Sequence, residues 1–209
     1  MLEDGFFISD RSWSCPEAGY VGDFLFQKRF CSRANRTNLN ELKLEGVSQI
    51  GEIGWCVRER FLIQAELGSG DFRWHSKNSG SSVSGRVRDG LIWSGGAKLL
   101  ILEAKETSIA VDGHAGGWDW MSTDESSESK LRYWQFGVGV VQKISLFNPY
   151  LGVAVNRTRL SVDHLHLHAK NTVGPFIGCS LTNGSKFFIN LEWREWFENG
   201  LSLSGQVRF

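Results

Sequence analysis

The chain has 209 residues, enough for one domain, and its 23 basic and 23 acidic residues leave no net charge at pH 7. A neutral chain has no field that favours nucleic acid, so we expect no nucleic-acid partner. The apolar runs are short, as at 99–102, which excludes a membrane-spanning helix of ~20 residues.

Residues 1–17 have no regular pattern and are predicted to be an irregular segment, whereas residues 18–209 are predicted to form one barrel. The first seven residues lack the basic and apolar stretches of a signal peptide, so an export signal is expected to have been trimmed or to lie upstream. From residue 19 onwards, apolar side chains alternate with polar or small ones, as in strands. In chain order, ten strands are predicted at 19–30, 39–56, 61–74, 91–100, 108–115, 134–141, 151–155, 173–181, 187–194 and 201–209.

The connections between these segments alternate in length. Short turns are predicted at 57–60, 103–106, 145–148 and 182–185, and longer polar loops at 31–37, 75–85, 121–130 and 163–171. Short periplasmic turns and longer external loops are typical of outer-membrane barrels. The sequence therefore predicts an all-β fold, a transmembrane antiparallel β-barrel of about ten strands (range 8–12), in the bacterial outer membrane.

The last nine residues carry the clearest alternation. Leu201, Leu203, Val207 and Phe209 fall on one side of an extended strand, and polar residues fall on the other. A terminal strand that ends in Phe resembles the assembly signal of bacterial outer-membrane barrels. This resemblance implies recognition by the barrel assembly machinery, with the apolar side chains facing lipid.

Polar residues on the opposite faces of the strands are expected to point into the lumen. About eight strands fill their own interior with side chains and 16–18 leave a water channel, so about ten strands lie near the filled limit. Mixed charges in so narrow a lumen are expected to pair and to leave a small conductance or none. The predicted lumen residues are Asp23, Gln27, Arg29, Gln64, Glu66, Lys98, Gln135, Lys143, Asn190, Glu192 and Arg194.

Several segments, in order along the chain, resemble the chlamydial major outer membrane protein porins. These are 19–26, 91–97, 134–155 with its Leu-Phe-Asn-Pro-Tyr-Leu-Gly-Val core, and the terminal 206–209. The resemblance implies a short, divergent member of that porin family. The chain is much shorter than the family members, so their pore size does not carry over. It also lacks their cysteine cluster near the start, which puts disulfide cross-linking of the envelope in doubt.

The function predicted is porin-like: a narrow channel for small solutes or ions, or a structural role in the envelope. Two alternatives remain. A closed barrel could act as an adhesin through loops 75–85 and 121–130, or an enzyme could occupy the barrel mouth. His114 and Asp112 could form an acid–base pair, but no nucleophile motif accompanies them, so no catalytic residue and no enzyme is expected.

No metal or cofactor is predicted. His164, His166 and His168 share one face of a possible strand, a spacing that can gather zinc, but no cysteine or second carboxylate joins them in sequence. Nine tryptophans, among them Trp74 and Trp134, suit aromatic girdles at the membrane interfaces.

In an oxidising compartment, Cys15, Cys31, Cys56 and Cys179 are disulfide candidates. Cys15 and Cys31 lie near opposite ends of the first strand, so bonds between molecules are favoured over a bond between these two. The expected partners are outer-membrane lipid, the barrel assembly machinery, and other copies of the chain or disulfide-linked envelope proteins.

Overall fold

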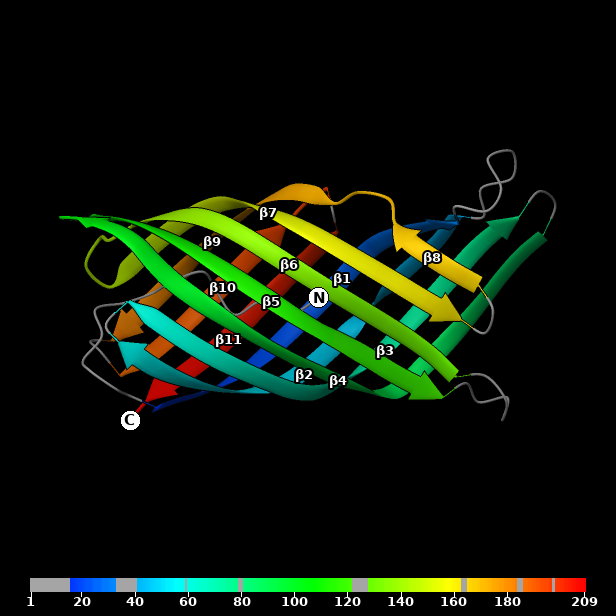
Figure 1. Cartoon of the computed structure of the whole chain (residues 1–209), viewed down its shortest axis with the longest axis horizontal. Helices are drawn as coiled ribbons and strands as arrows, with labels where there is room; N and C mark the ends of the chain where they lie inside the picture. The colour runs from blue at the N-terminus through cyan, green and yellow to red at the C-terminus, as the bar shows by residue number, and fades with distance from the viewer. Residues whose placement is uncertain are drawn as a thin grey trace.

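A computed structural model describes residues 16–32, 41–58, 60–78, 81–121, 128–162, 165–183, 186–196 and 198–209. Its named elements are all strands (Figure 1). No helix in these ranges is long and apolar enough to cross a membrane. The strands are β1 (Pro16–Ser32), β2 (Glu41–Arg58), β3 (Phe61–Asn78), β4 (Ser81–Ala104), β5 (Thr107–Met121), β6 (Glu128–Gln142), β7 (Phe147–Val162), β8 (Leu165–Ala169), β9 (Val173–Asn183), β10 (Phe187–Arg194) and β11 (Asn199–Arg208).

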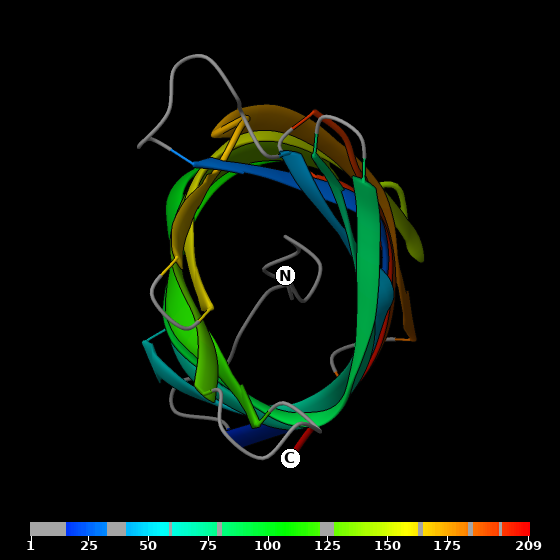
Figure 2. The ribbon, with the colours of Figure 1, turned by 90° about the vertical axis from the view of Figure 1, so that its right-hand side faces the viewer.

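Ten of these strands close into one antiparallel barrel. Strands β1 to β7 pair in sequence order, β9 pairs with β7, and β10 and β11 continue the sheet. The last strand returns to the first, with a register that runs from Glu17↔Arg208 to Gln27↔Asn199. Figure 2, viewed along the barrel, shows the closed wall. The predicted fold class is confirmed.

The two faces of the wall differ as the alternation predicted. In β10, the side chains of Phe187, Ile189, Leu191 and Trp193 are exposed, and those between them are buried. Large apolar side chains are exposed around the outside of the other strands as well. A closed barrel leaves no backbone edge unpaired in lipid, so an apolar outer face is favourable there. This fold and this surface confirm the predicted location in the bacterial outer membrane.

Both chain ends of the barrel lie at the same end of the wall. The backbone N–H of Phe209 donates to the carbonyl of Pro16 at 3.1 Å. The connections at this end, 59–60, 105–106, 143–146 and 184–186, have two to four residues. Because short turns face the periplasm in such barrels, we call this the periplasmic end and the opposite one the surface end.

The short strand β8 gives the wall two different strand numbers. Strands β9, β10 and β11 have only 11, 8 and 10 residues, whereas β7 has 16. Beyond the surface ends of these three strands, β8 takes their place in the wall. It pairs with the end of β7 on one side and with Phe30–Ser32 of β1 on the other. The wall thus has ten strands near the periplasm and eight at the surface end.

Two predicted external loops are corrected. The segment 75–85 was expected to be a loop, but β3 continues to Asn78 and β4 restarts at Ser81, with a ladder that ends at Asn78↔Ser81. The segment 163–171 contains β8 rather than loop alone. In both places the polar residues pair through their backbones, which side-chain polarity does not reveal. Strand β1 begins at Pro16, just inside the segment 1–17 that was expected to be irregular.

Candidate functional site

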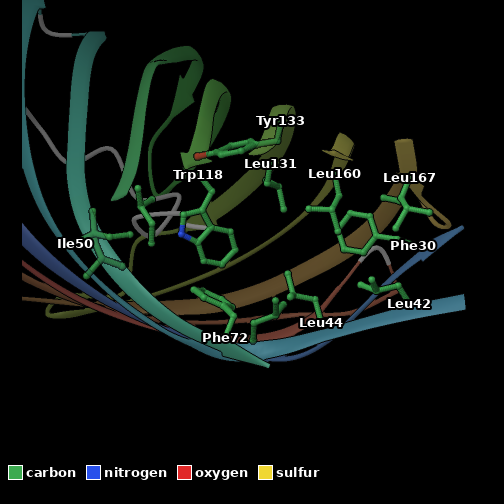
Figure 3. Packing of buried hydrophobic residues seen from close by; sticks show 14 residues of the cluster. Phe30, Leu42, Leu44, Ile50, Phe72, Trp118, Leu131, Tyr133, Leu160 and Leu167 are labelled. Atoms are coloured by element: carbon green, nitrogen blue, oxygen red, sulfur yellow. The ribbon is translucent and has the colours of Figure 1, made fainter. Parts of the chain in front are cut away.

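The candidate site is the barrel interior, and a cluster of apolar side chains lies in its surface-end half. Buried side chains from β1 to β8 meet there in one cluster, the upper cluster (Figure 3). The rings of Phe72 and Trp118 pack edge to face at its centre. A void of about 30 Å³ beside them has room for only about one or two water molecules. The upper cluster comprises Val21, Leu25, Phe30, Leu42, Leu44, Ile50, Phe72, Ile92, Trp118, Leu131, Tyr133, Leu160, Leu167 and Ala169.

A second apolar cluster, the lower cluster, lies inside the periplasmic half. The rings of Tyr150 and Phe176, from β7 and β9, lie 6.4 Å apart between centroids. Cys56 and Leu62 form a small apolar contact at the same end, near the β2–β3 turn. The lower cluster comprises Leu100, Ala110, Val141, Tyr150, Ala154, Phe176 and Phe188. Two apolar layers in series therefore occupy the lumen.

Four charged side chains form a buried network close to the seam between β1 and the C-terminal strands. Lys28 Nζ donates to Glu198 Oε2 at 2.9 Å, and Arg194 Nε lies 3.3 Å from the other oxygen of Glu198. Arg194 also donates to Asp23 through its NH2 group. The side chain of Arg194 is 0% exposed, and the other three side chains of the network are buried as well. This charge network balances two cations with two carboxylates, as burial of charge requires.

A β-bulge in β1 builds this network. The ladder to β2 skips from Leu25 to Lys28, and the ladder to β11 skips from Leu25 to Gln27. One extra residue reverses which side chains face inwards. The side chain of Lys28 is therefore buried in the lumen, whereas that of Arg29 is exposed on the outside. The prediction that Arg29 faces the lumen was wrong for this reason.

The charge network makes stability depend on pH. Burial alone raises the pKa of Glu198, in the loop 195–198, but the charges of Lys28 and Arg194 outweigh it and lower the pKa to about 2. A carboxyl group with a lowered pKa contributes stability above its unfolded value of 4.5, and this contribution is lost as the pH falls towards 2. We expect the free energy of unfolding to fall by up to about 3 kcal/mol over that range.

Urea unfolding at a series of pH values, followed by tryptophan fluorescence, measures this effect. The Glu198→Gln variant should be less stable at pH 7, because Lys28 then loses a charged partner, and should change less between pH 4.5 and 2. Identical pH profiles for the two proteins would contradict this role of Glu198.

Between the two apolar clusters, buried polar side chains contact one another. Ser94 donates to Glu66, and Gln64 Nε2 donates to Glu66 Oε1 at 3.2 Å. His114 lies between two carboxylates, with Nδ1 3.9 Å from Glu66 Oε1 and Nε2 3.4 Å from Asp112 Oδ2. All five side chains are buried. The arrangement holds acid–base groups together, but away from solvent.

Polar contacts also cross the seam. Gln206 Nε2 of β11 donates to Glu52 Oε2 of β2 at 2.9 Å, over the intervening strand β1. Gly19 of β1 makes this possible, since a Cβ there would lie 2.9 Å from Gln206 Cγ and 3.0 Å from Glu52 Oε2. Arg208 and Glu17, opposite each other in the β1–β11 ladder, form an ion pair at 3.6 Å.

Eight of the eleven predicted lumen residues have side chains buried inside the barrel. The side chain of Gln27 is half-buried at the bulge, and Arg29 lies outside. Lys143 lies beyond the end of β6 and pairs with Glu103 at the periplasmic rim, so its assignment to the lumen is corrected too. The eight are Asp23, Gln64, Glu66, Lys98, Gln135, Asn190, Glu192 and Arg194.

Several buried charges escaped the sequence reasoning. Glu52 lies in a segment interrupted by glycines, although its spacing from Ile50 and Ser48 signals the inner face. Lys28 depends on the bulge. Glu198 lies in a loop, where alternation gives no signal. The side chain of Trp74, expected in a girdle, packs on the upper cluster.

The remaining predicted features fall on the wall or outside it. Leu203, Val207 and Phe209 are exposed on the outer face, with Phe209 74% exposed, and Leu201 is half-buried on that face. Among the described cysteines the structure contains no disulfide bond; Cys56 is buried, and Cys31 and Cys179 are half-buried. Cys15 and His164 lie outside the described residues, and His166 is exposed on β8.

No family model matches the sequence, and no curated protein matches it either. Among solved structures, the β-domain of the Bordetella autotransporter BrkA is similar, with a TM-score of 0.51 and 10% identity over 95% of this chain and 99% of that one. The translocator domain of the autotransporter NalP from Neisseria meningitidis has a TM-score of 0.43 and 14% identity, with 97% and 90% covered. The outer membrane protease OmpT from Escherichia coli has a TM-score of 0.44 and 9% identity, with 94% and 96% covered. The first of these supports the barrel fold.

Proposed function

We propose that this chain is a filled outer-membrane barrel with a structural role in the envelope, and that it passes at most small ions. The observation that carries the proposal is the occupied lumen: the upper and lower clusters and the polar layer between them are built from buried side chains. A diffusion channel for solutes needs an unobstructed path, and ten strands leave little room for one. As a relative of the chlamydial porins that it resembles, this chain would be a short member of the family whose channel is closed.

The residual pathway, if ions use it, should prefer cations. Buried acidic side chains inside the barrel outnumber buried basic ones among the described residues, seven to four. A narrow lumen of low dielectric strengthens the effect of such an imbalance. No enzymatic activity is part of the proposal, because His114 and its carboxylate neighbours are enclosed between the two clusters.

Liposome swelling and planar-bilayer recording of the refolded protein test the proposal. We expect no uptake of sugars and either no conductance or a small cation-selective one. Free passage of sugars through the unmodified barrel would contradict it.

Because two apolar clusters close the lumen in series, variants that thin one or both of them give a sharper test of the proposal. Phe72→Ala with Trp118→Ala thins the upper cluster, and Tyr150→Ala with Phe176→Ala thins the lower one. Neither pair alone should raise conductance much, because the other layer still closes the lumen, whereas all four changes together should raise it clearly. Replacement of the lipid-facing Phe136 by Ala is the matched control and should change nothing, since this side chain is exposed on the outer face.

A second candidate is surface display, as in the adhesin alternative. It is favoured by the β3–β4 hairpin, which extends past the other strands at the surface end (Figure 1). Residues 81–90 of β4 pair with β3 alone among the described strands. Removal of the tip of this hairpin should abolish adhesion to host cells without loss of the barrel if display is the function.

A further inference from the structure

Four basic side chains gather on the outer face of β6 and β7, near their surface ends. They are Lys130, Arg132, Arg157 and Arg159, which we call the basic patch. Arg132 and Arg159 are direct partners in the β6–β7 ladder, and Arg157 lies one outward position below Arg159. The side chains of Lys130, Arg157 and Arg159 are exposed.

Two of the four cations in this basic patch, Arg157 and Arg159, carry its uncompensated charge among the described residues. Arg132 Nη2 pairs with Asp119 Oδ1 at 2.7 Å and its guanidinium stacks over Trp93, so this residue is held in place. Within the part of the chain that the structure describes, neither Arg157 nor Arg159 has a carboxylate partner. Two neighbouring arginines without counter-charge repel each other unless an anion joins them.

The opposite side of the barrel carries acidic as well as basic side chains on its outer face at the same end. On β2 to β4, Arg86 pairs with Asp71 at 3.2 Å, and His75 lies 3.4 Å from Glu45. On that side these two carboxylates each lie beside a basic side chain, whereas Arg157 and Arg159 have no carboxylate partner among the described residues.

The height of the basic patch matches the head groups of the outer leaflet. Below it, β6 presents Phe136 and Trp134 to the outside, and β7 presents Val153 and Val155. Trp134 is the direct ladder partner of Arg157. Tryptophan marks the boundary between hydrocarbon and head groups in membrane barrels, so Arg157 and Arg159 lie immediately on the polar side of that boundary.

We propose that the basic patch binds the phosphate groups of a phosphorylated glycolipid of the outer leaflet, of the lipid A class. Arginine presents paired N–H donors that match phosphate oxygens, and an exposed side chain beside an aromatic girdle meets that ligand in the plane of the membrane. The acyl chains would lie on the apolar strip of β6 and β7 below. This inference goes beyond the structural role and does not depend on whether the lumen conducts.

Binding of bisphosphorylated lipid A to the refolded barrel in detergent micelles tests the proposal, with affinity measured by native mass spectrometry or by displacement of a fluorescent lipid A. Arg157→Gln combined with Arg159→Gln should weaken binding at least tenfold, which corresponds to ~1.4 kcal/mol. Arg73→Gln combined with Arg86→Gln, on the side of the wall that also carries Glu45 and Asp71, is the matched control and should change affinity less than about twofold. Heat-modifiable gel mobility verifies that each variant is folded.

Two further arms identify the chemistry. Dephosphorylated lipid A should bind weakly to the unmodified barrel, with the same affinity that intact lipid A has for the Arg157→Gln/Arg159→Gln variant. The variant Arg157→Lys with Arg159→Lys should retain part of the affinity for intact lipid A. Equal loss in the control variant, unchanged binding in the double variant, or inorganic phosphate that binds as tightly as lipid A would each overturn the proposal.

Discussion

Replacement of Arg194 by Met is expected to lower the free energy of unfolding by about 3–5 kcal/mol. Arg194 connects Asp23 and Glu198 inside the barrel, and its side chain is 0% exposed. Removal of the guanidinium leaves buried carboxylate charge without its full complement of counter-charge. An uncompensated buried charge lowers the free energy of unfolding by several kcal/mol unless the carboxylate takes up a proton or water enters the site. Urea unfolding of the refolded barrel measures the change.

The matched control is Lys186→Met, which removes a cation from an exposed turn and should cost less than about 1 kcal/mol. A double-mutant cycle of Asp23→Asn and Arg194→Met should show a clear coupling energy, because the two side chains form one ion pair. A loss below about 1 kcal/mol for Arg194→Met would mean that the buried pairs contribute little and that the bulge in β1 has another purpose.

Deletion of Phe209 is expected to prevent assembly in cells but to leave refolding in detergent nearly unchanged. The residue follows the last strand, its side chain is 74% exposed, and its N–H makes one backbone bond, to Pro16. The loss of one such bond costs only about 1 kcal/mol. If the terminal Phe is the signal that the assembly machinery recognises, the deletion should remove nearly all assembled barrel from the outer membrane.

Phe187→Ala is the control for this deletion, because that side chain is also outward and aromatic, and its residue is opposite Val207 in the neighbouring ladder. It should assemble normally. Heat-modifiable mobility of protein from membrane fractions, compared with that of refolded protein, separates recognition from stability. Normal assembly without Phe209 would show that the signal lies elsewhere in the chain.

The wall of the barrel could be predicted from the sequence because its physical cause is local. Side chains of a strand alternate between lipid and lumen, so outward positions within the hydrocarbon layer must be apolar or small, as in β10 and in Leu203 and Val207 of β11. This rule identified ten strands, the fold class and the membrane, and most of the polar residues that it assigned to the lumen do face inwards. The short turns, such as the one predicted at 182–185, were located for the same reason, since turn residues act on their own backbone.

The interior was decided only by the tertiary structure, because its contacts join residues far apart in the chain. Arg194 and Asp23 are 171 positions apart, and Lys28 and Glu198 are 170 apart. One extra residue in β1 reversed the inward assignment from Arg29 to Lys28, and a bulge has no signature in alternation alone. The strand β8 and the long β3–β4 hairpin depend on backbone pairing with neighbouring strands, which polar side chains neither require nor prevent. Alternation determines which residues can face the lumen, but closure of the barrel determines which of them meet.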